Sequence, residues 1–229
     1  MTLTDARTVM LLAATVGVAL IFDNAGRSEL TSASQTVPLK IVWLDDCSVS
    51  VGGGLFQVRS RRKTEMIQAV SRRLRSADGM TVGTFCTDIR IAPGWWRSTQ
   101  ELSRAVDQVV QPAGAPSPIW DAVHRAVERL SQETAKRAVF LVSDGKSSGN
   151  LLGFEEAAGL ATRRSVIVFA TQVVGSGSRQ PRPGDAAEYL LRLAELTGGK
   201  YAETRWLQTG DFFGSAVTAL VAGSPGAFR

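Results

Sequence analysis

Two hydrophobic patterns alternate along the chain after Pro38. Short apolar runs rich in β-branched and aromatic residues end at Asp, Gly or Ser, which is typical of buried strands. Between these runs, apolar residues recur every three or four positions and predict amphipathic helices. The predicted strands are Lys40–Leu44, Val82–Phe85, Ala138–Val142 and Ser165–Ala170. The helical stripes are Met66, Ile67, Val70 and Leu74; Leu102, Val106, Val109 and Val110; Ile119, Val123, Val127 and Leu130; and Leu190, Leu193, Ala194 and Leu196.

This alternation predicts an α/β fold, in which a doubly wound, mostly parallel central sheet is flanked by helices on both faces. The chain has 229 residues, of which 44% are hydrophobic and 21% charged. That length accommodates one full domain plus extra segments, and the composition excludes a disordered tail, a coiled coil and a polytopic membrane protein. We assign the domain to residues 35–229 and expect ligands to bind at the carboxyl ends of its strands.

The amino-terminal segment, residues 1–34, predicts a signal peptide or a membrane anchor followed by a linker. Thr8–Phe22 carries no charged residue. It is shorter than the roughly 20 residues of a transmembrane helix and fits the apolar region of an export signal. Arg27–Val37 is polar and reads as the linker. We therefore expect a secreted or membrane-anchored, extracytoplasmic protein rather than a cytoplasmic one, although a buried helix stays open.

Polar loops near the predicted strand ends carry the candidate chemistry. One loop begins at Asp45 directly after the first strand, a second begins at Ser143 after the third, and a third precedes the helix at Ile119. Together they bring two carboxylates and three hydroxyls to one rim of the sheet. These five predicted metal ligands are Asp46, Ser48, Ser50, Ser117 and Asp144.

All five side chains offer hard oxygen atoms, which suit Mg²⁺ and also Mn²⁺ or Ca²⁺. If the hydroxyls bind directly and a carboxylate acts through water, the inner shell carries little negative charge. The metal would then accept a carboxylate from a partner. With two cysteines and one histidine in the chain, Cys/His zinc sites are excluded.

The same loops resemble the von Willebrand factor type A domain with its metal-ion-dependent adhesion site. Asp46-Cys47-Ser48-Val49-Ser50 matches the family pattern D-x-S-x-S. Ser117-Pro118-Ile119-Trp120-Asp121-Ala122 is similar to the T-P-h-Y-D-A stretch, and Val142-Ser143-Asp144-Gly145 matches the strand-S-D-G stretch. The resemblance covers Pro38 to Val221. It implies a Rossmann-like fold and a non-enzymatic module that binds a protein partner presenting Asp or Glu.

Two departures from the family pattern keep a metal-free scaffold domain open as an alternative. Ser117 replaces Thr and lacks the methyl group that fixes the hydroxyl rotamer. Ala115-Pro116 replaces Gly-Gly. A serine hydrolase is a further alternative, in which His124 would be the base, although the chain has no G-x-S-x-G motif.

Nucleotide and nucleic-acid binding are not expected. Gly145-Lys146-Ser147 resembles the end of a phosphate loop, but Phe140 stands where such a loop needs its first Gly. Seven basic residues within positions 59–75 read as a solvated helix face, because no aromatic residues interleave with them.

Two further features leave structural alternatives open. Cys47 and Cys86 follow neighbouring strands, where we favour free, partly buried thiols over a disulfide. Trp95-Trp96 is either an exposed anchor for a partner or a loop packed over the sheet edge.

Overall fold

The computed structural model describes residues 20–22, 28–30, 37–47, 61–112, 114, 116–174 and 186–223. The chain divides into two compact units, Met1–Thr36 and Val37–Arg229. In the first unit, β1 (Leu20–Phe22) pairs antiparallel with β2 (Ser28–Leu30), which lies within the predicted linker. Residues 8–19 of the predicted leader lie outside the described residues. In the described part of the chain, no helix combines the length and apolar character that a membrane span requires.

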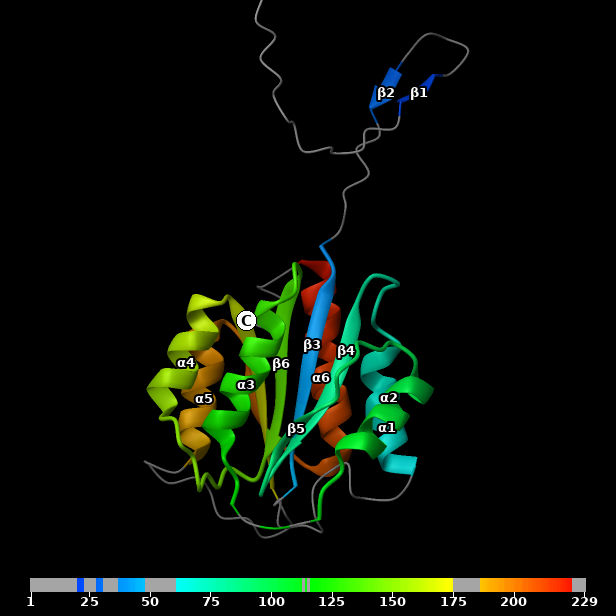
Figure 1. The fold of residues 1–229 in the computed structure, drawn as a ribbon. Coiled ribbons are helices and arrows are strands. Elements are labelled where there is room, and N and C mark those ends of the chain that lie inside the picture. The colour runs from blue at the N-terminus through cyan, green and yellow to red at the C-terminus, as the bar shows by residue number, and fades with distance from the viewer. Residues whose placement is uncertain are drawn as a thin grey trace, which may run out of the picture. The chain divides into compact units, whose positions relative to one another are not determined.

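The second unit is built on a six-stranded sheet with the order β5-β4-β3-β6-β7-β8 (Figure 1). All neighbouring strands run parallel except β4 and β5, which are antiparallel. The predicted doubly wound α/β fold is confirmed. The strands are β3 (Leu39–Asp46), β4 (Gly79–Phe85), β5 (Ile89–Ile91), β6 (Lys136–Ser143), β7 (Val166–Val173) and β8 (Tyr201–Thr204).

Helices cover both faces of this sheet. One face packs against α1, α2 and α6, and the other against α3, α4 and α5 (Figure 1). The helices are α1 (Arg61–Ser71), α2 (Thr99–Val109), α3 (Ile119–Ser131), α4 (Phe154–Arg163), α5 (Ala186–Thr197) and α6 (Trp206–Ala222).

The apolar run of β3 is continuous because side chains on both faces of the strand are buried. Ile41 and Trp43 point to the layer of α1, α2 and α6, whereas Val42 and Leu44 point to the opposite layer. The α6 side of the core contains an aromatic group, in which the ring of Phe213 lies 4.9 Å from the ring of Trp43. Successive strand residues face opposite sides of a sheet, so a strand buried twice shows no polar alternation.

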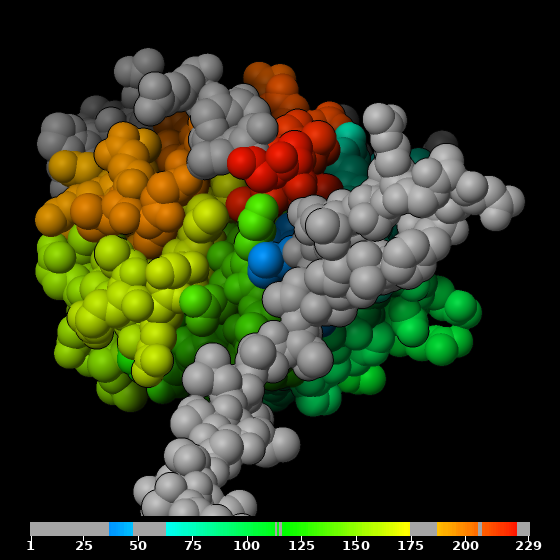
Figure 2. Space-filling model, turned by 90° about the horizontal axis from the view of Figure 1, so that it is seen from above, coloured from blue at the N-terminus to red at the C-terminus, as the bar shows by residue number. Residues whose placement is uncertain are grey.

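A buried ion pair stabilises the amino end of the sheet. Asp78 accepts a hydrogen bond from the amide of Leu39 at 2.8 Å, and its carboxylate lies 2.9 Å from the guanidinium of Arg75. Burial favours a higher pKa for Asp78, but the hydrogen bonds from Arg75 and Leu39 outweigh it and lower the pKa below its ordinary value. At this end, viewed in Figure 2, the tip of α6 (red) lies near the start of β3 (blue). Lys136 closes the contact, since its ammonium donates to the carbonyl of Leu220 at 3.1 Å.

The opposite end of the sheet contains the topological switch point. The chain leaves β3 toward α1 and β4 on one side, whereas β6, on the other side of β3, leads into α4 and β7. Open sheets of this kind bind their ligands at such a switch point, outside the carboxyl ends of the strands. The strands are longer than predicted, because Asp45 and Asp46 belong to β3 and Ser143 belongs to β6.

Candidate functional site

The buried carboxylate of Asp46 lies at the carboxyl end of β3, at this switch point. Its Oδ2 atom accepts hydrogen bonds from the hydroxyl of Ser117 at 2.6 Å and from the hydroxyl of Ser143 at 2.7 Å. Asp46 and Ser143 are fully buried, and Ser117 is 3% exposed. Residues 71 and 97 positions away from Asp46 thus meet on one oxygen atom. A buried carboxylate requires such donors because desolvation of an unpaired charge is costly.

Ser143 links Asp46 to the second predicted carboxylate, Asp144, which follows it directly in the chain. The hydroxyl of Ser143 also accepts a hydrogen bond from the amide of Gly145 at 3.1 Å. Gly145 adopts φ +81°, and a Cβ atom there would lie 2.8 Å from Nε2 of Gln172. Glycine is therefore required at this turn, for both its backbone conformation and its small size.

The side chain of Asp144 is only 7% exposed, and its surroundings orient it in three ways. Its Oδ1 accepts a hydrogen bond from the amide of Lys146 at 3.0 Å, while the ammonium of Lys146 lies 3.5 Å from Oδ2. Gln172 on β7 donates to the carbonyl of Asp144 at 3.0 Å and accepts a hydrogen bond from the hydroxyl of Tyr201 at 2.7 Å. Burial, with a smaller contribution from the charge of Glu203, raises the pKa of Tyr201 to about 12, so this hydroxyl stays a donor at neutral pH.

The loop after Asp144 is tied to the loop that carries Ser117. The amide of Ser117 donates to the hydroxyl of Ser148 at 3.1 Å, and the amide of Ser148 donates to the carbonyl of Ser117 at 2.9 Å. Asp121, in the first turn of α3, accepts from the amides of Leu151 and Leu152 at 2.9 and 2.8 Å. These bonds hold the two loops in one arrangement, which positions the Ser117 hydroxyl beside Asp46.

The carboxylate and hydroxyl oxygen atoms at this end of the sheet are compatible ligands for a hard divalent cation. A hydroxyl that donates its proton to Asp46 keeps lone pairs on its oxygen, so Ser117 can orient the carboxylate and still offer a ligand atom. Among the described residues, no three His, Cys, Asp or Glu side chains cluster as a metal site. A site here therefore depends on hydroxyl ligands beside the two carboxylates, as the sequence predicts. Such a set suits Mg²⁺ or Mn²⁺.

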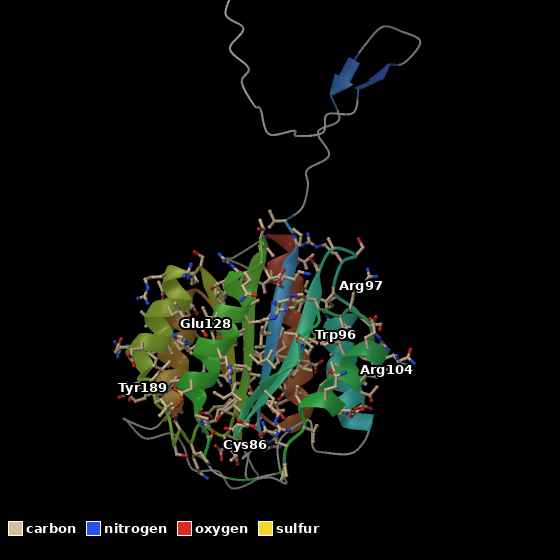
Figure 3. The ribbon with its side chains drawn as sticks, in the orientation of Figure 1. Cys86, Trp96, Arg97, Arg104, Glu128 and Tyr189 are labelled. Carbon is tan, nitrogen blue, oxygen red and sulfur yellow. A yellow bond between two sulfur atoms is a disulfide. The ribbon has the colours of Figure 1, made fainter. Side chains whose placement is uncertain are left out.

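A disulfide joins the ends of β3 and β4 beside Asp46. Cys47 and Cys86 are bonded, with their Cα atoms 5.7 Å apart, so the expectation of free thiols is wrong. Asp46 pairs with Phe85 in the parallel register, which makes Cys47 and Cys86 the next pair. Paired positions on neighbouring strands point to the same face, and the two sulfur atoms can meet. Figure 3 shows Cys86 at the carboxyl end of the sheet.

The structure brings together part of the predicted ligand set. Asp46 and Ser117 are in direct contact, and Asp144 lies one residue from their partner Ser143. Ser48 and Ser50 lie outside the described residues. The sequence did not predict the roles of Ser143 and Gln172. The position of Ser143 immediately before Asp144 was the available signal, because that serine forms part of the matching motif.

Other sequence features have structural roles. Nδ1 of His124 lies 3.7 Å from Oε2 of Glu128 on the same helix, and the hydroxyl of Ser117 donates to Asp46 rather than to His124. Trp95 packs over the sheet edge, since its indole donates to Glu133 at 2.8 Å. Within the basic segment, the ammonium of Lys63 lies 2.7 Å from Asp107.

Comparison with known proteins identifies the family. The von Willebrand factor type A domain family matches residues 40–213, which include nearly all of the sheet, five of the six flanking helices, the first half of α6 and every predicted ligand. The chain belongs to the von Willebrand factor type A domain family. Domains of this family are generally interaction modules that bind protein partners.

Solved structures of the family share this fold. A von Willebrand factor type A protein from Catenulispora acidiphila is 14% identical, with a TM-score of 0.62, over 81% of this chain and 43% of its own. Proximal thread matrix protein 1 from the mussel byssus, solved with zinc in its adhesion-site motif, is 17% identical, with a TM-score of 0.59, over 80% and 46%. The manganese-loaded TRAP protein of Plasmodium vivax is 15% identical, with a TM-score of 0.51, over 77% and 72%. This chain thus spans less than half of the length of the Catenulispora and mussel proteins. No curated protein sequence matches it.

Proposed function

We propose that this von Willebrand factor type A domain binds a protein partner through a divalent cation, with Mg²⁺ as the first choice and Mn²⁺ or Ca²⁺ as alternatives. Asp46, Ser48, Ser50, Ser117 and Asp144 would hold the ion, and an Asp or Glu side chain of the partner would complete its shell. The observation that carries the proposal is the convergence of the Ser117 and Ser143 hydroxyls on the buried Asp46 carboxylate.

The residues of the chain supply orientation and charge balance. Ser143 holds Asp46 in place, and the bonds between Ser117 and Ser148 fix the loop that presents the Ser117 oxygen. When bound, the cation supplies an electrophilic centre for a carboxylate. Because hydroxyls contribute to the shell in place of further carboxylates, the ion keeps enough positive charge to attract an anionic ligand.

A matched set of variants tests the metal site. Calorimetric titration of the whole chain with Mg²⁺ and Mn²⁺ is expected to show saturable binding that Asp46→Asn and Asp144→Asn each abolish. Glu195→Gln is the control, since it removes an exposed carboxylate from the last turn of α5, which leads into the amino end of β8, at the end of the sheet opposite Asp46. Binding that survives both site substitutions would refute the assignment of ligands.

The metal-free scaffold is the second candidate, and the ion pair between Lys146 and Asp144 favours it. An ammonium 3.5 Å from the carboxylate already balances part of its charge. This candidate predicts no heat on titration and no shift of the thermal midpoint with Mg²⁺. Lys146→Gln separates the two cases, because it should strengthen metal binding if Lys146 competes with the cation and should have no such effect in a scaffold.

We also propose that the domain works outside the cytoplasm, carried there by residues 1–34 acting as a signal or an anchor. The disulfide between Cys47 and Cys86 supports this location, because disulfides persist in oxidising compartments and are rare in the cytosol. Amino-terminal sequencing of the protein recovered from its native compartment tests the proposal. A start within or just after residues 1–34 indicates cleavage, and an intact start in the membrane fraction indicates an anchor. Full-length protein confined to the soluble cytoplasm would overturn it.

A further inference from the structure

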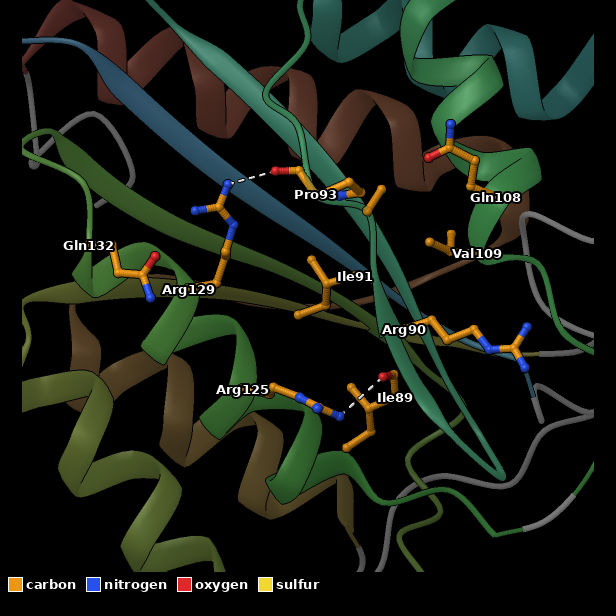
Figure 4. Close-up of a pocket in the computed structure, with 10 residues that line it drawn as sticks. Ile89, Arg90, Ile91, Pro93, Gln108, Val109, Arg125, Arg129 and Gln132 are labelled. Carbon is orange, nitrogen blue, oxygen red and sulfur yellow. Dashed lines mark hydrogen bonds between the residues drawn. The ribbon is translucent and has the colours of Figure 1, made fainter.

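A concave surface lies along the outer edge of the sheet, and neither Asp46 nor the serines bonded to it line it. It is a groove of about 760 Å³ over the edge strand β5, with α3 on one side and the end of α2 on the other (Figure 4). Three of the ten residues that line it are arginines, and none is acidic. These arginines are Arg90, Arg125 and Arg129.

The two arginines of α3 stand one helical turn apart and face the same side of β5. Arg129 is held in place, because it donates to the carbonyl of Pro93 at 2.9 Å and its guanidinium lies 4.7 Å from the ring centre of Trp95. Glu133, 3.4 Å from this guanidinium, balances part of its charge, so the charge of the groove rests mainly on Arg90 and Arg125. Arg125 is exposed and makes only a long hydrogen bond of 3.3 Å to the carbonyl of Ile89 (Figure 4). Within the described part of the chain, no carboxylate lies within ion-pair distance of Arg125.

Arg90 places a third positive charge on the opposite face of the same strand. Its neighbours Ile89 and Ile91 pack toward the α3 layer, and side chains alternate along a strand, so Arg90 faces the α2 side. Its side chain is 48% exposed, and its ion pair with Asp88 is long, at 3.6 Å. Positive charge therefore lies on both faces of the edge strand β5. Ile91 and the end of α2 line the groove between these charges.

We propose that this groove binds an acidic, extended peptide segment of a protein partner. A segment in extended conformation presents alternate side chains to opposite sides, which matches arginines on both faces of β5. The carbonyls of Ile89 and Pro93 already accept hydrogen bonds from Arg125 and Arg129. Backbone pairing along β5 is therefore limited, and recognition comes from guanidinium–carboxylate contacts, which are strong and directional.

Carboxylates fit the groove better than nucleic acid does. Single-stranded nucleic acids bind through exposed aromatic rings on which bases stack. The nearby ring of Trp95 is covered by two cations, since Lys40 lies 5.4 Å and Arg129 4.7 Å from its ring centre. The ring is thus occupied within the protein, and the groove offers cations and aliphatic side chains in its place.

The test is fluorescence anisotropy of the whole chain with a labelled peptide of alternating glutamate and alanine, in EDTA. A glutamine–alanine peptide is the neutral control. We expect saturable binding of the acidic peptide alone, weakened about tenfold by Arg90→Gln combined with Arg125→Gln. Arg163→Gln combined with Arg164→Gln removes the same charge from exposed positions at the end of α4 and is expected to leave binding unchanged.

Several outcomes would overturn the proposal. The first is equal binding of the acidic peptide by the wild type and by the variant that combines Arg90→Gln with Arg125→Gln. The second is an equal loss of binding in the variant that combines Arg163→Gln with Arg164→Gln. The third is a single-stranded oligonucleotide that binds more tightly than the peptide and that the Arg90 and Arg125 double variant no longer binds. Because EDTA removes divalent cations, the result of these titrations does not depend on the metal site. Binding that appears only when Mg²⁺ replaces EDTA would place the peptide at Asp46, which also contradicts the groove.

Discussion

Replacing Ser143 with Ala tests the hydrogen-bond network around Asp46. The substitution removes a hydroxyl that donates to Oδ2 of Asp46 and also the acceptor for the amide of Gly145. Both Asp46 and Ser143 are fully buried, so water does not easily replace the lost bonds. Asp46 keeps its bond from Ser117 but loses part of the compensation for its desolvation.

The expected cost follows from the two lost bonds. A hydrogen bond to a charged group contributes about 1.5–3 kcal/mol and a neutral one about 1 kcal/mol, so we expect Ser143→Ala to lower the free energy of unfolding by about 2.5–4 kcal/mol. For a domain of this size, that change corresponds to a fall in the thermal midpoint of roughly 5–15 °C. If the proposed metal site exists, the affinity for Mg²⁺ should also fall by about tenfold or more, as it does when a residue that orients a ligand is lost.

Urea unfolding in EDTA, followed by circular dichroism, measures the change in stability. Ser131→Ala is the matched control, because the hydroxyl of Ser131 donates to the carbonyl of Val127 within α3. Such a bond inside a helix adds little, so the control should stay within about 0.5 kcal/mol of the wild type. If Ser143→Ala costs no more than the control, Asp46 does not depend on this hydroxyl, and our description of the network is wrong.

Three further predictions concern stability and pH. Asp78→Asn should lower the free energy of unfolding by about 2–3 kcal/mol at neutral pH, because it breaks the buried pair with Arg75. The pKa of Asp78 is lowered in the folded state, so the difference in free energy of unfolding between the wild type and Asp78→Asn should be full above about pH 4 and vanish as the pH falls through the folded pKa. Urea unfolding at several pH values measures this difference, and a difference that does not change with pH would contradict the prediction. Replacing both Cys47 and Cys86 with Ala should lower the free energy of unfolding by about 4 kcal/mol, because the unfolded chain gains the entropy of an open loop between residues 39 positions apart. Urea unfolding measures this change, and an unchanged midpoint would count against the disulfide. In an absorbance titration, Tyr201, one of the two tyrosines of the chain, should ionise at about 12, and this ionisation step should be absent from Tyr201→Phe. Because this pKa is raised, the associated stability is full below the unfolded value of 10.0 and is lost as the pH rises through about 12. Ionisation of Tyr201 near 10.0 would be incompatible with its burial.

Core elements were predictable from the sequence because their patterns arise from burial. β3, β4, β6 and β7 are buried on both faces and read as apolar runs, and α2 and α3 carry clear apolar stripes. The patterns did not reveal β5 and β8, which are short edge strands of partial burial. They also did not reveal α4 or α6, since α4 buries three small alanines beside Phe154, and α6 is apolar over most of its surface.

The disulfide was not predictable because it depends on strand register. The sequence places Cys47 and Cys86 near two strand ends but does not state which residues of the strands lie opposite each other. A register shifted by one residue would turn one of the two side chains to the other face of the sheet. Only the pairing of Asp46 with Phe85 brings the sulfur atoms together.

The sequence by itself determined the α/β class of this von Willebrand factor type A domain and indicated the end of the sheet at which we propose the metal site. Both follow from local properties, namely the period of apolar residues and the polar residues that end buried strands. Only the tertiary structure decided that Ser143 supports Asp46, and that Arg90 and Arg125 flank one exposed edge. These contacts join segments far apart in the chain, and their existence depends on strand order, register and helix placement, which no local pattern encodes.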